Sequence, residues 1–206
     1  MNNILVISAN QYDETYSCGG TLLKHKFNND KINLLICAEL KEGQTNFSDM
    51  EKLYSMYPFD SISSLGLQSE EIDKFKINSL KSKISKVINK IKPNIVYLPS
   101  RDNSYSIYDK IFEASYDCAK TFEYPFVKKI YMMETLKSID SINVTIDDKF
   151  IPNVLVNIDD FIEKKIQIVK EFEKNTDNEK NIRATATLRG YTEGKNIESF
   201  ILLKEI

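Results

Sequence analysis

Residues 3–22 read NILVISANQYDETYSCGGTL, and this stretch decides the fold class. The near-continuous apolar run of residues 3–9 is typical of a parallel strand that is covered on both faces. Cys18-Gly19-Gly20 then opens a helical pattern, and residues 32–38, INLLICA, repeat the buried-strand pattern. The helical residues expected to face inward are Leu22, Leu23 and Phe27. Strand, helix and strand within about 36 residues form one βαβ unit with a right-handed crossover.

The rest of the chain continues the alternation of strands and helices. Further strands are predicted at 59–65, 94–99, 128–135 and 153–158, and helices at 50–57, 69–92, 106–121 and 159–175, followed by a polar tail that ends in ESFILL. The strands at 3–9, 32–38 and 94–99 are expected to be neighbours. With 206 residues, the chain suits one domain. We therefore predict a single domain over 1–206, an α/β Rossmann-like three-layer sandwich with a mostly parallel sheet.

Composition excludes several classes of function. Lys and Arg total 28 against 30 for Asp and Glu, so no basic surface for nucleic acid is expected. No apolar run approaches the ~20 residues of a membrane span, and the first residues lack the basic region of a signal peptide, which favours a cytoplasmic location. Three scattered cysteines are typical of buried reduced thiols. The one histidine, His25, lies in a Lys-His-Lys segment where solvent exposure is expected, which argues against a Cys–His catalytic pair.

Polar side chains follow three of the predicted strands. Ligands of an open parallel sheet bind outside the carboxyl ends of its strands, so we expect the three loops to converge on one pocket. Each residue taken alone also fits an ordinary loop polar group. The residues offered are Asn10, Asp13, Glu14, Glu39, Arg101, Asp102, Asn103, Tyr105 and Tyr108.

Short motifs along the whole chain resemble, in order, those of the LmbE/PIG-L family of zinc-dependent N-deacetylases. The first is Asn10-Gln11-Tyr12-Asp13-Glu14 followed by Gly19-Gly20-Thr21, which resembles the family's opening Ala-His-Pro-Asp-Asp-Glu and Gly-Gly-Thr. The others are Ser64-Leu65-Gly66-Leu67, Pro93-Asn94-Ile95-Val96, Met133-Glu134, Phe150-Ile151-Pro152 with Lys164-Lys165, and Arg189-Gly190 with Glu198-Ser199-Phe200. The resemblance implies the family's fold.

The resemblance also implies the family's zinc-dependent chemistry, but this sequence departs from the family's residues at the positions that carry it. The family's zinc ligands would fall on Asn10, Asp13 and, in the segment that matches Tyr105 to Tyr108, on Tyr108, while its general base would fall on Tyr12. Only Asp13 keeps the family's residue. Amide oxygen and neutral phenol are poor ligands for zinc, and water without the metal keeps a pKa near ~15.7. We therefore predict that the family's zinc is absent and that no other metal or cofactor is bound.

The residues that stand at the family's catalytic and metal positions lead to two hypotheses about function. One hypothesis is a catalytically silent pseudoenzyme with only vestigial catalytic positions at Tyr12 and Asp13. It would bind a small molecule such as an N-acylated sugar, a protein partner or a second copy of the chain. The expected ligand-binding residues are Asn10, Asp13, Glu14, Arg101, Asp102, Tyr105 and Tyr108. The alternative is an active hydrolase of N-acylated sugars or related glycosides, with a rearranged site built on carboxylates such as Asp13, Glu14, Asp102 or Asp109.

Overall fold

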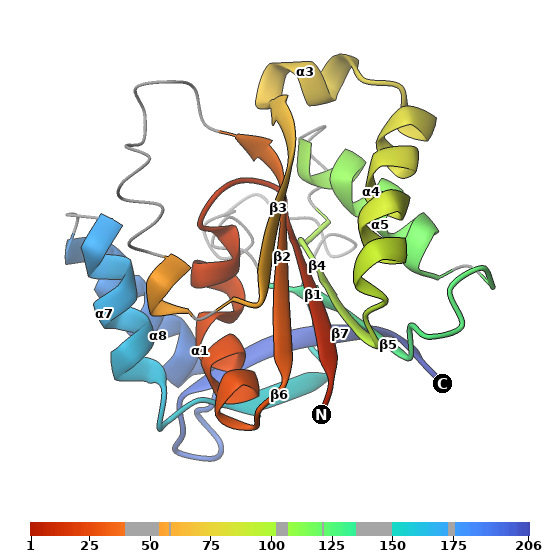
Figure 1. Cartoon of the computed structure of the whole chain (residues 1–206). Coiled ribbons are helices and arrows are strands. Elements are labelled where there is room, and N and C mark those ends of the chain that lie inside the picture. Colours follow the sequence, from red (N-terminus) through yellow and green to blue (C-terminus); the bar gives the residue numbers. More distant parts are fainter. Residues whose placement is uncertain (40–53, 58, 102–106, 121, 135–149, 173–175) are drawn as a thin grey trace.

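The architecture is one seven-stranded sheet between two layers of helices (Figure 1), seen in a computed structural model that describes residues 1–39, 54–57, 59–101, 107–120, 122–134, 150–172 and 176–206. The strand order is β3-β2-β1-β4-β5-β7-β6. The strands are β1 (Asn3–Ser8), β2 (Lys31–Glu39), β3 (Ser61–Gln68), β4 (Ile95–Leu98), β5 (Lys129–Met133), β6 (Val154–Asn157) and β7 (Ile197–Glu205). Strands β1 to β5 pair in parallel, and β7 runs antiparallel to both of its neighbours. The predicted α/β sandwich with a mostly parallel sheet is confirmed, and so is the adjacency of β2, β1 and β4.

The alternating side chains of β1 divide the core between the two helical layers. Leu5 and Ile7 pack in the cluster beneath α4 and α5, whereas Ile4 and Val6 pack in the cluster beneath α1, and all four are fully buried. Figure 1 shows α1, α7 and α8 on one face of the sheet and α4 and α5 on the other. The helices are α1 (Asp13–Phe27), α3 (Ser69–Lys74), α4 (Ile77–Ile91), α5 (Ile107–Ala119), α7 (Ile162–Phe172) and α8 (Thr176–Arg189). None of the described helices combines the length and apolar character needed to cross a membrane.

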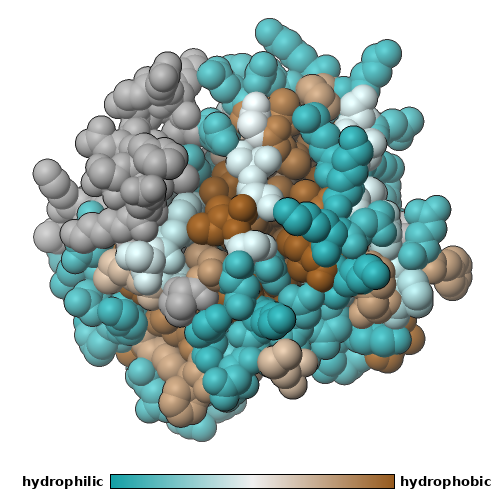
Figure 2. All heavy atoms as spheres, in the orientation of Figure 1, coloured by the Kyte–Doolittle hydropathy of each residue, from teal (hydrophilic) through white to brown (hydrophobic). Residues whose placement is uncertain are grey.

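Strand β3 forms one edge of the sheet. Its side chains alternate between half-buried and exposed along most of its length, and Ile62 is 44% exposed. Figure 2 views the molecule from the β3 edge of the sheet and shows hydrophobic side chains at the centre of that surface, between the two helical layers.

The three cysteines are free and buried, as predicted.

Several element predictions were wrong in detail. Helix α1 begins at Asp13 and not at Cys18, and Phe27 is 77% exposed instead of facing inward. The helix predicted over 69–92 is divided, because Phe75 and Lys76 have extended backbone conformations between α3 and α4. The segment read as a polar tail forms α8, a helix that contributes only Ile182 and Ala186 to the buried core and therefore has a weak apolar pattern.

Helix α1 is broken at Cys18, whose φ of −141° and ψ of 17° lie outside the helical region. Two buried charges hold the break. The Glu198 carboxylate accepts hydrogen bonds from the backbone N–H groups of Gly20 (2.8 Å) and Thr21 (2.7 Å), which begin the second helical segment. The Lys165 ammonium donates to the carbonyl of Tyr16 at 2.6 Å and to Glu198 at 2.8 Å. We call the Lys165–Glu198 pair the buried clamp; it satisfies backbone groups on both sides of the break.

A second pair of charges lies next to the buried clamp. Arg189, the last residue of α8, forms an ion pair with Glu134 at the end of β5. Ser199 donates its hydroxyl hydrogen to the same carboxylate at 2.6 Å. Gly190 follows directly, and a Cβ atom there would lie 1.9 Å from the carbonyl oxygen of Lys195, so the turn from α8 into β7 needs glycine.

Candidate functional site

The candidate site lies where the connections of the sheet change direction. The chain leaves β1 through α1 to β2 on one side, and later returns to β4 on the other side of β1. Such a switch point leaves a crevice outside the carboxyl ends of the two central strands. Asn10 follows the end of β1 here, and Asp13 begins α1.

Three side chains meet at this point through a connected set of hydrogen bonds. The backbone N–H of Asn10 donates to the Asp13 carboxylate at 2.7 Å, and the Asn10 side-chain amide donates to the Tyr108 hydroxyl oxygen at 2.9 Å. The Tyr108 hydroxyl in turn donates to Asp13 at 3.0 Å. We call Asn10, Asp13 and Tyr108 the strand-end cluster. Ser69, at the start of α3, donates to the Asn10 side-chain oxygen at 3.4 Å.

Tyr12 takes an unusual backbone conformation between two members of this cluster. Its φ of 73° lies in the left-handed region, which costs a residue other than glycine about 1–2 kcal/mol. Its carbonyl accepts the first two hydrogen bonds of α1, from the N–H groups of Thr15 and Tyr16. The ring is only 9% exposed and packs in the core cluster beneath α1.

Glu14 is completely buried behind the cluster. Its carboxylate accepts hydrogen bonds from the hydroxyls of Ser8 (3.0 Å) and Thr15 (3.1 Å). Burial, with a smaller contribution from the charge of Asp13, raises the pKa of Glu14 to about 7. A ligand in the crevice would not reach this carboxylate without a change of conformation.

The remaining predicted site residues form no hydrogen bond with the strand-end cluster among the contacts of the described residues. Arg101 is exposed and lines a different groove with Asp73 and Asp109, on the α5 side of the sheet. Glu39 accepts a hydrogen bond from the hydroxyl of Ser64 on β3. Asp102, Asn103 and Tyr105 lie outside the described residues.

Sequence reasoning missed two side chains that lie near the cluster. Ser69 was assigned only to a helix, and no local pattern marks it as a neighbour of Asn10. Tyr54 lies close enough to Glu14 and Asp13 that their charges add to burial in raising the pKa of its phenol. The Tyr54 hydroxyl is buried and has no hydrogen-bond partner among the described residues.

The donors of the strand-end cluster do not fit zinc. A catalytic zinc site takes about three ligands from His, Cys or carboxylate side chains. The cluster offers one carboxylate, one amide and one phenol, whose polar atoms already hydrogen-bond to each other. Within the described part of the chain, no group of three or more His, Cys, Asp or Glu side chains is placed to hold a metal ion.

His25, which was expected to be exposed, is partly buried at the other end of α1. Its ring is 16% exposed and lies between the Asp30 carboxylate, 2.8 Å from Nδ1, and the Tyr97 hydroxyl, 2.9 Å from Nε2. Burial lowers the pKa of His25, and the positive charge of Lys24 adds to this effect. The expectation failed because Tyr97 lies 72 residues away in sequence and approaches only when β4 pairs with β1.

In sequence, the chain matches no protein-family model and no curated protein. In structure, it is similar to the conserved protein TT1542 from Thermus thermophilus, with a TM-score of 0.80, 17% identity and coverage of 100% of this chain and 96% of that one. It is also similar to N,N'-diacetylchitobiose deacetylase from Pyrococcus horikoshii, with a TM-score of 0.76, 16% identity and coverage of 98% and 83%. A third similar structure is GalB, the 4-carboxy-2-hydroxymuconate hydratase from Pseudomonas putida, with a TM-score of 0.75, 10% identity and coverage of 100% and 98%.

These likenesses show a shared fold. The same fold carries a deacetylase in one neighbour and a hydratase in another, so the reaction must be argued from the site of each protein.

Proposed function

We propose that this chain is a deacetylase-like protein without metal-dependent hydrolysis, which binds an N-acylated sugar or a related glycoside at the carboxyl ends of β1 and β4. The observation that carries the proposal is the mutual hydrogen bonding of Asn10, Asp13 and Tyr108. By the resemblance, these are the three positions at which the family holds its zinc. A carboxylate, an amide and a phenol that satisfy each other form a stable polar surface that needs no ion.

The chemistry of the cluster supports recognition of a sugar. Sugar hydroxyls and N-acyl groups both donate and accept hydrogen bonds, and the cluster contains an anionic acceptor, an amide with both functions and a phenol. A tyrosine also offers an apolar ring face beside its hydroxyl. Among the structural neighbours, one is named for deacetylation of N,N'-diacetylchitobiose and others for deacetylation of teicoplanin, which agrees with this ligand class.

Calorimetric titration of the full chain without an affinity tag tests the proposal. N,N'-Diacetylchitobiose should bind in a saturable way, and glucosamine, which lacks the acyl group, should bind at least about tenfold more weakly. Tyr108→Phe removes the hydroxyl that joins Asn10 to Asp13 and should weaken binding by about tenfold. Tyr116→Phe, on the same helix, is the matched control and should change affinity less than about twofold. Equal affinities for the acylated and unacylated sugars would contradict the assignment of the ligand.

Metal content tests the other half of the proposal. Purified protein without a chelating tag should contain no stoichiometric zinc, and a chelator should leave its melting temperature unchanged. The triple variant Asn10→His, Tyr12→Asp, Tyr108→His restores the family's residues and should take up about one zinc per chain if the backbone has kept the spacing of the family's site. A folded triple variant that takes up no zinc would show that more than the side chains has changed.

The alternative is a hydrolase that works through carboxylates. The raised pKa of Glu14 favours it, because acid–base catalysts work best with a pKa near the working pH. Burial against Ser8 and Thr15 argues for a structural role of that carboxyl group. Release of acetate from N,N'-diacetylchitobiose by metal-free protein, lost in Asp13→Asn but not in the exposed control Glu113→Gln, would favour the hydrolase over the binding protein.

A further inference from the structure

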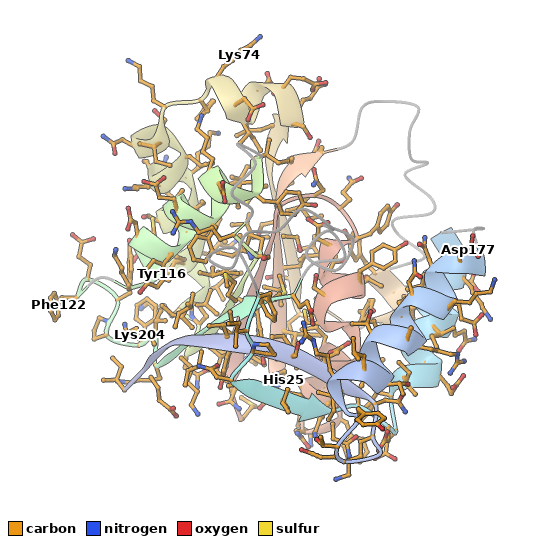
Figure 3. All side chains as sticks on the ribbon, turned by 180° about the vertical axis from the view of Figure 1, so that it is seen from behind. His25, Lys74, Tyr116, Phe122, Asp177 and Lys204 are labelled. Atoms are coloured by element: carbon orange, nitrogen blue, oxygen red, sulfur yellow. The ribbon has the colours of Figure 1, made fainter. Side chains whose placement is uncertain are left out.

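A second cavity, of about 580 Å³, lies at the opposite end of the sheet from the strand-end cluster. Its lining includes Ile95 and Lys129, the first residues of β4 and β5, whereas Asn10 follows the carboxyl end of β1. The last turns of α1 and strand β6 form its walls, and Figure 3 labels His25 in this lower part of the molecule, near β6. Cavities of roughly 300–1,000 Å³ are typical of small-molecule sites.

Aromatic rings from three strands contribute to the lining. Tyr97 and Tyr131 stack with ring centroids 5.2 Å apart, and Phe200 packs against Tyr97 at 5.3 Å and against Tyr131 at 6.2 Å. Because these three rings support each other, the aromatic surface is rigid. Phe200 is fully buried and Tyr97 is 3% exposed, so these two rings support the half-buried ring of Tyr131, which offers the accessible aromatic face to a cyclic ligand.

One polar atom at the cavity lacks a partner. Thr21 lines the cavity and is 2% exposed, and its hydroxyl oxygen has no hydrogen-bond partner in the described part of the chain. Buried polar groups are nearly always hydrogen-bonded, and this hydroxyl, which is buried beside the cavity, would gain a partner from a bound water molecule or a ligand.

His25 arranges a second polar atom in the same wall. The Asp30 carboxylate can only accept, so it fixes the proton of the neutral imidazole on Nδ1 and leaves Nε2 to accept from the Tyr97 hydroxyl. Asp30 also accepts a hydrogen bond from the backbone N–H of Asn2 at 2.6 Å, which holds the carboxylate in place. The Tyr97 hydroxyl is therefore held in a fixed direction by His25, in a residue that is only 3% exposed.

The charges at the cavity are of one sign. Lys24 and Lys129 contribute to its lining, and no Asp or Glu of the described residues does. Lys129 is paired with Glu205, at 2.6 Å. Lys24 donates to the carbonyl of Asn157 at 3.1 Å, and no carboxylate in the described ranges pairs with it. An ammonium group that contacts only a carbonyl can still take an anionic ligand.

We propose that this cavity binds a small ring compound that carries one anionic group. The anion lies at Lys24, the ring packs on Tyr131, which Tyr97 and Phe200 support, and a polar substituent lies beside the buried Thr21 hydroxyl. The site is separate from the strand-end cluster, so it stands or falls independently of the function proposed there.

The test titrates the full chain with two fluorescent probes that share an anilinonaphthalene-type ring system and differ in charge. The anionic probe 8-anilinonaphthalene-1-sulfonate should bind one site per chain, and neutral N-phenyl-1-naphthylamine should bind at least about tenfold more weakly. Raising NaCl from about 0.05 to 0.5 M should weaken only the anionic probe, because its attraction to Lys24 is screened. Equal affinity of the two probes, or no response to salt, would overturn the proposal.

Two matched pairs of variants place the probe at this cavity. Lys24→Met should weaken the anionic probe by about fivefold, and the exposed control Lys180→Met by less than about twofold. Leu155→Glu adds a negative charge beside the cavity and should weaken the probe by about tenfold, while Leu188→Glu, an exposed position outside it, should not. Circular dichroism checks that each variant is folded. Equal losses within either pair would place the probe elsewhere and overturn the proposal, whereas Tyr108→Phe should leave probe binding unchanged.

Discussion

The buried clamp and the strand-end cluster both act on the first turns of α1, and they are built on different principles. In the buried clamp, Lys165 and Glu198 are opposite charges with almost no exposure, and each also satisfies backbone groups of the broken helix. In the strand-end cluster, a single carboxylate is held by an amide and a phenol. Both residues of the clamp match motifs of the deacetylase resemblance, whereas only Asp13 of the cluster does.

The difference shows which part of such a site is free to change. A buried charge whose partner is removed is strongly destabilising, so neither member of the clamp can change alone. At the strand ends, the neutral side chains of Asn10 and Tyr108 hydrogen-bond to each other, and Tyr108 donates to Asp13. The one charge in this cluster, on Asp13, is stabilised by neutral hydrogen-bond donors, so removing one donor leaves the other in place.

Removing the Glu198 carboxylate should give the largest effect. Glu198→Leu leaves the Lys165 ammonium buried beside one carbonyl and leaves the N–H groups of Gly20 and Thr21 without an acceptor, so we expect a loss of about 3–5 kcal/mol in the free energy of unfolding. Urea denaturation measures it. Lys180→Met, which removes an exposed ion pair, should cost less than about 1 kcal/mol. A comparable cost for both variants would mean that the clamp does not differ from a surface pair.

Glu14, which lies between the two regions, should make stability depend on pH. Its folded-state pKa of about 7 is raised above its ordinary 4.5, so its contribution is fully present below pH 4.5 and is lost as pH rises through 7. Glu14→Gln keeps the neutral form at every pH. The wild-type chain should therefore lose up to about 3 kcal/mol relative to this variant between pH 4.5 and pH 8. If the free energies of unfolding of the two proteins change equally with pH, burial does not raise the pKa of Glu14. The control variant Glu113→Gln, at an exposed position, should show the same pH dependence of stability as the wild type.

Close packing at the break in α1 gives a smaller effect. A Cβ atom at Gly20 would lie 2.9 Å from Cδ1 of Ile158, so Gly20→Ala should destabilise the fold by about 1–3 kcal/mol. Cβ and Cγ2 of Ile158 lie 3.0 Å from the added atom, so Ile158→Ala, which removes both Cδ1 and Cγ2, should make the double variant more stable than the summed costs predict, as measured by thermal denaturation. A double variant with the summed cost of both changes would place the strain elsewhere.

The smallest effect on stability is expected at the strand-end cluster. Tyr108→Phe removes one hydroxyl from a partly exposed network, where water can replace it, so the free energy of unfolding should fall by only about 1 kcal/mol. A loss as large as that of Glu198→Leu would erase the contrast between the two regions and make the cluster part of the structural frame.

The sequence predicted the central part of the fold because buried parallel strands leave an unmistakable pattern. The apolar runs that became β1, β2 and β4 are recognisable alone, and the rule for parallel sheets placed Asn10 and Asp13 at their carboxyl ends. Helix α8 was missed because only one narrow strip of it is buried. A single sequence has no signal for a helix that is polar on most of its surface.

Site residues could be predicted only where they lie close together in sequence or match a motif of a known family. Asn10 and Asp13 belong to one turn, and the resemblance supplied Tyr108. Ser69 and Tyr54 come from distant segments, and Tyr97 reaches His25 only through the pairing of β4 with β1. These contacts depend on tertiary packing, which no local pattern records.

The hydrogen bonds of Glu198 also constrain the order in which the molecule can assemble. Gly20 and Thr21 lie 178 and 177 residues before their acceptor, so most of the chain must be made before the second segment of α1 receives its cap. Contacts of such long range slow folding, because the intervening loop must be closed first. During synthesis on a ribosome, the sheet around β1 can begin to form before β7 is made, while the second segment of α1 still lacks its cap. Helix α1, although early in the sequence, is then among the last elements of this domain to be completed.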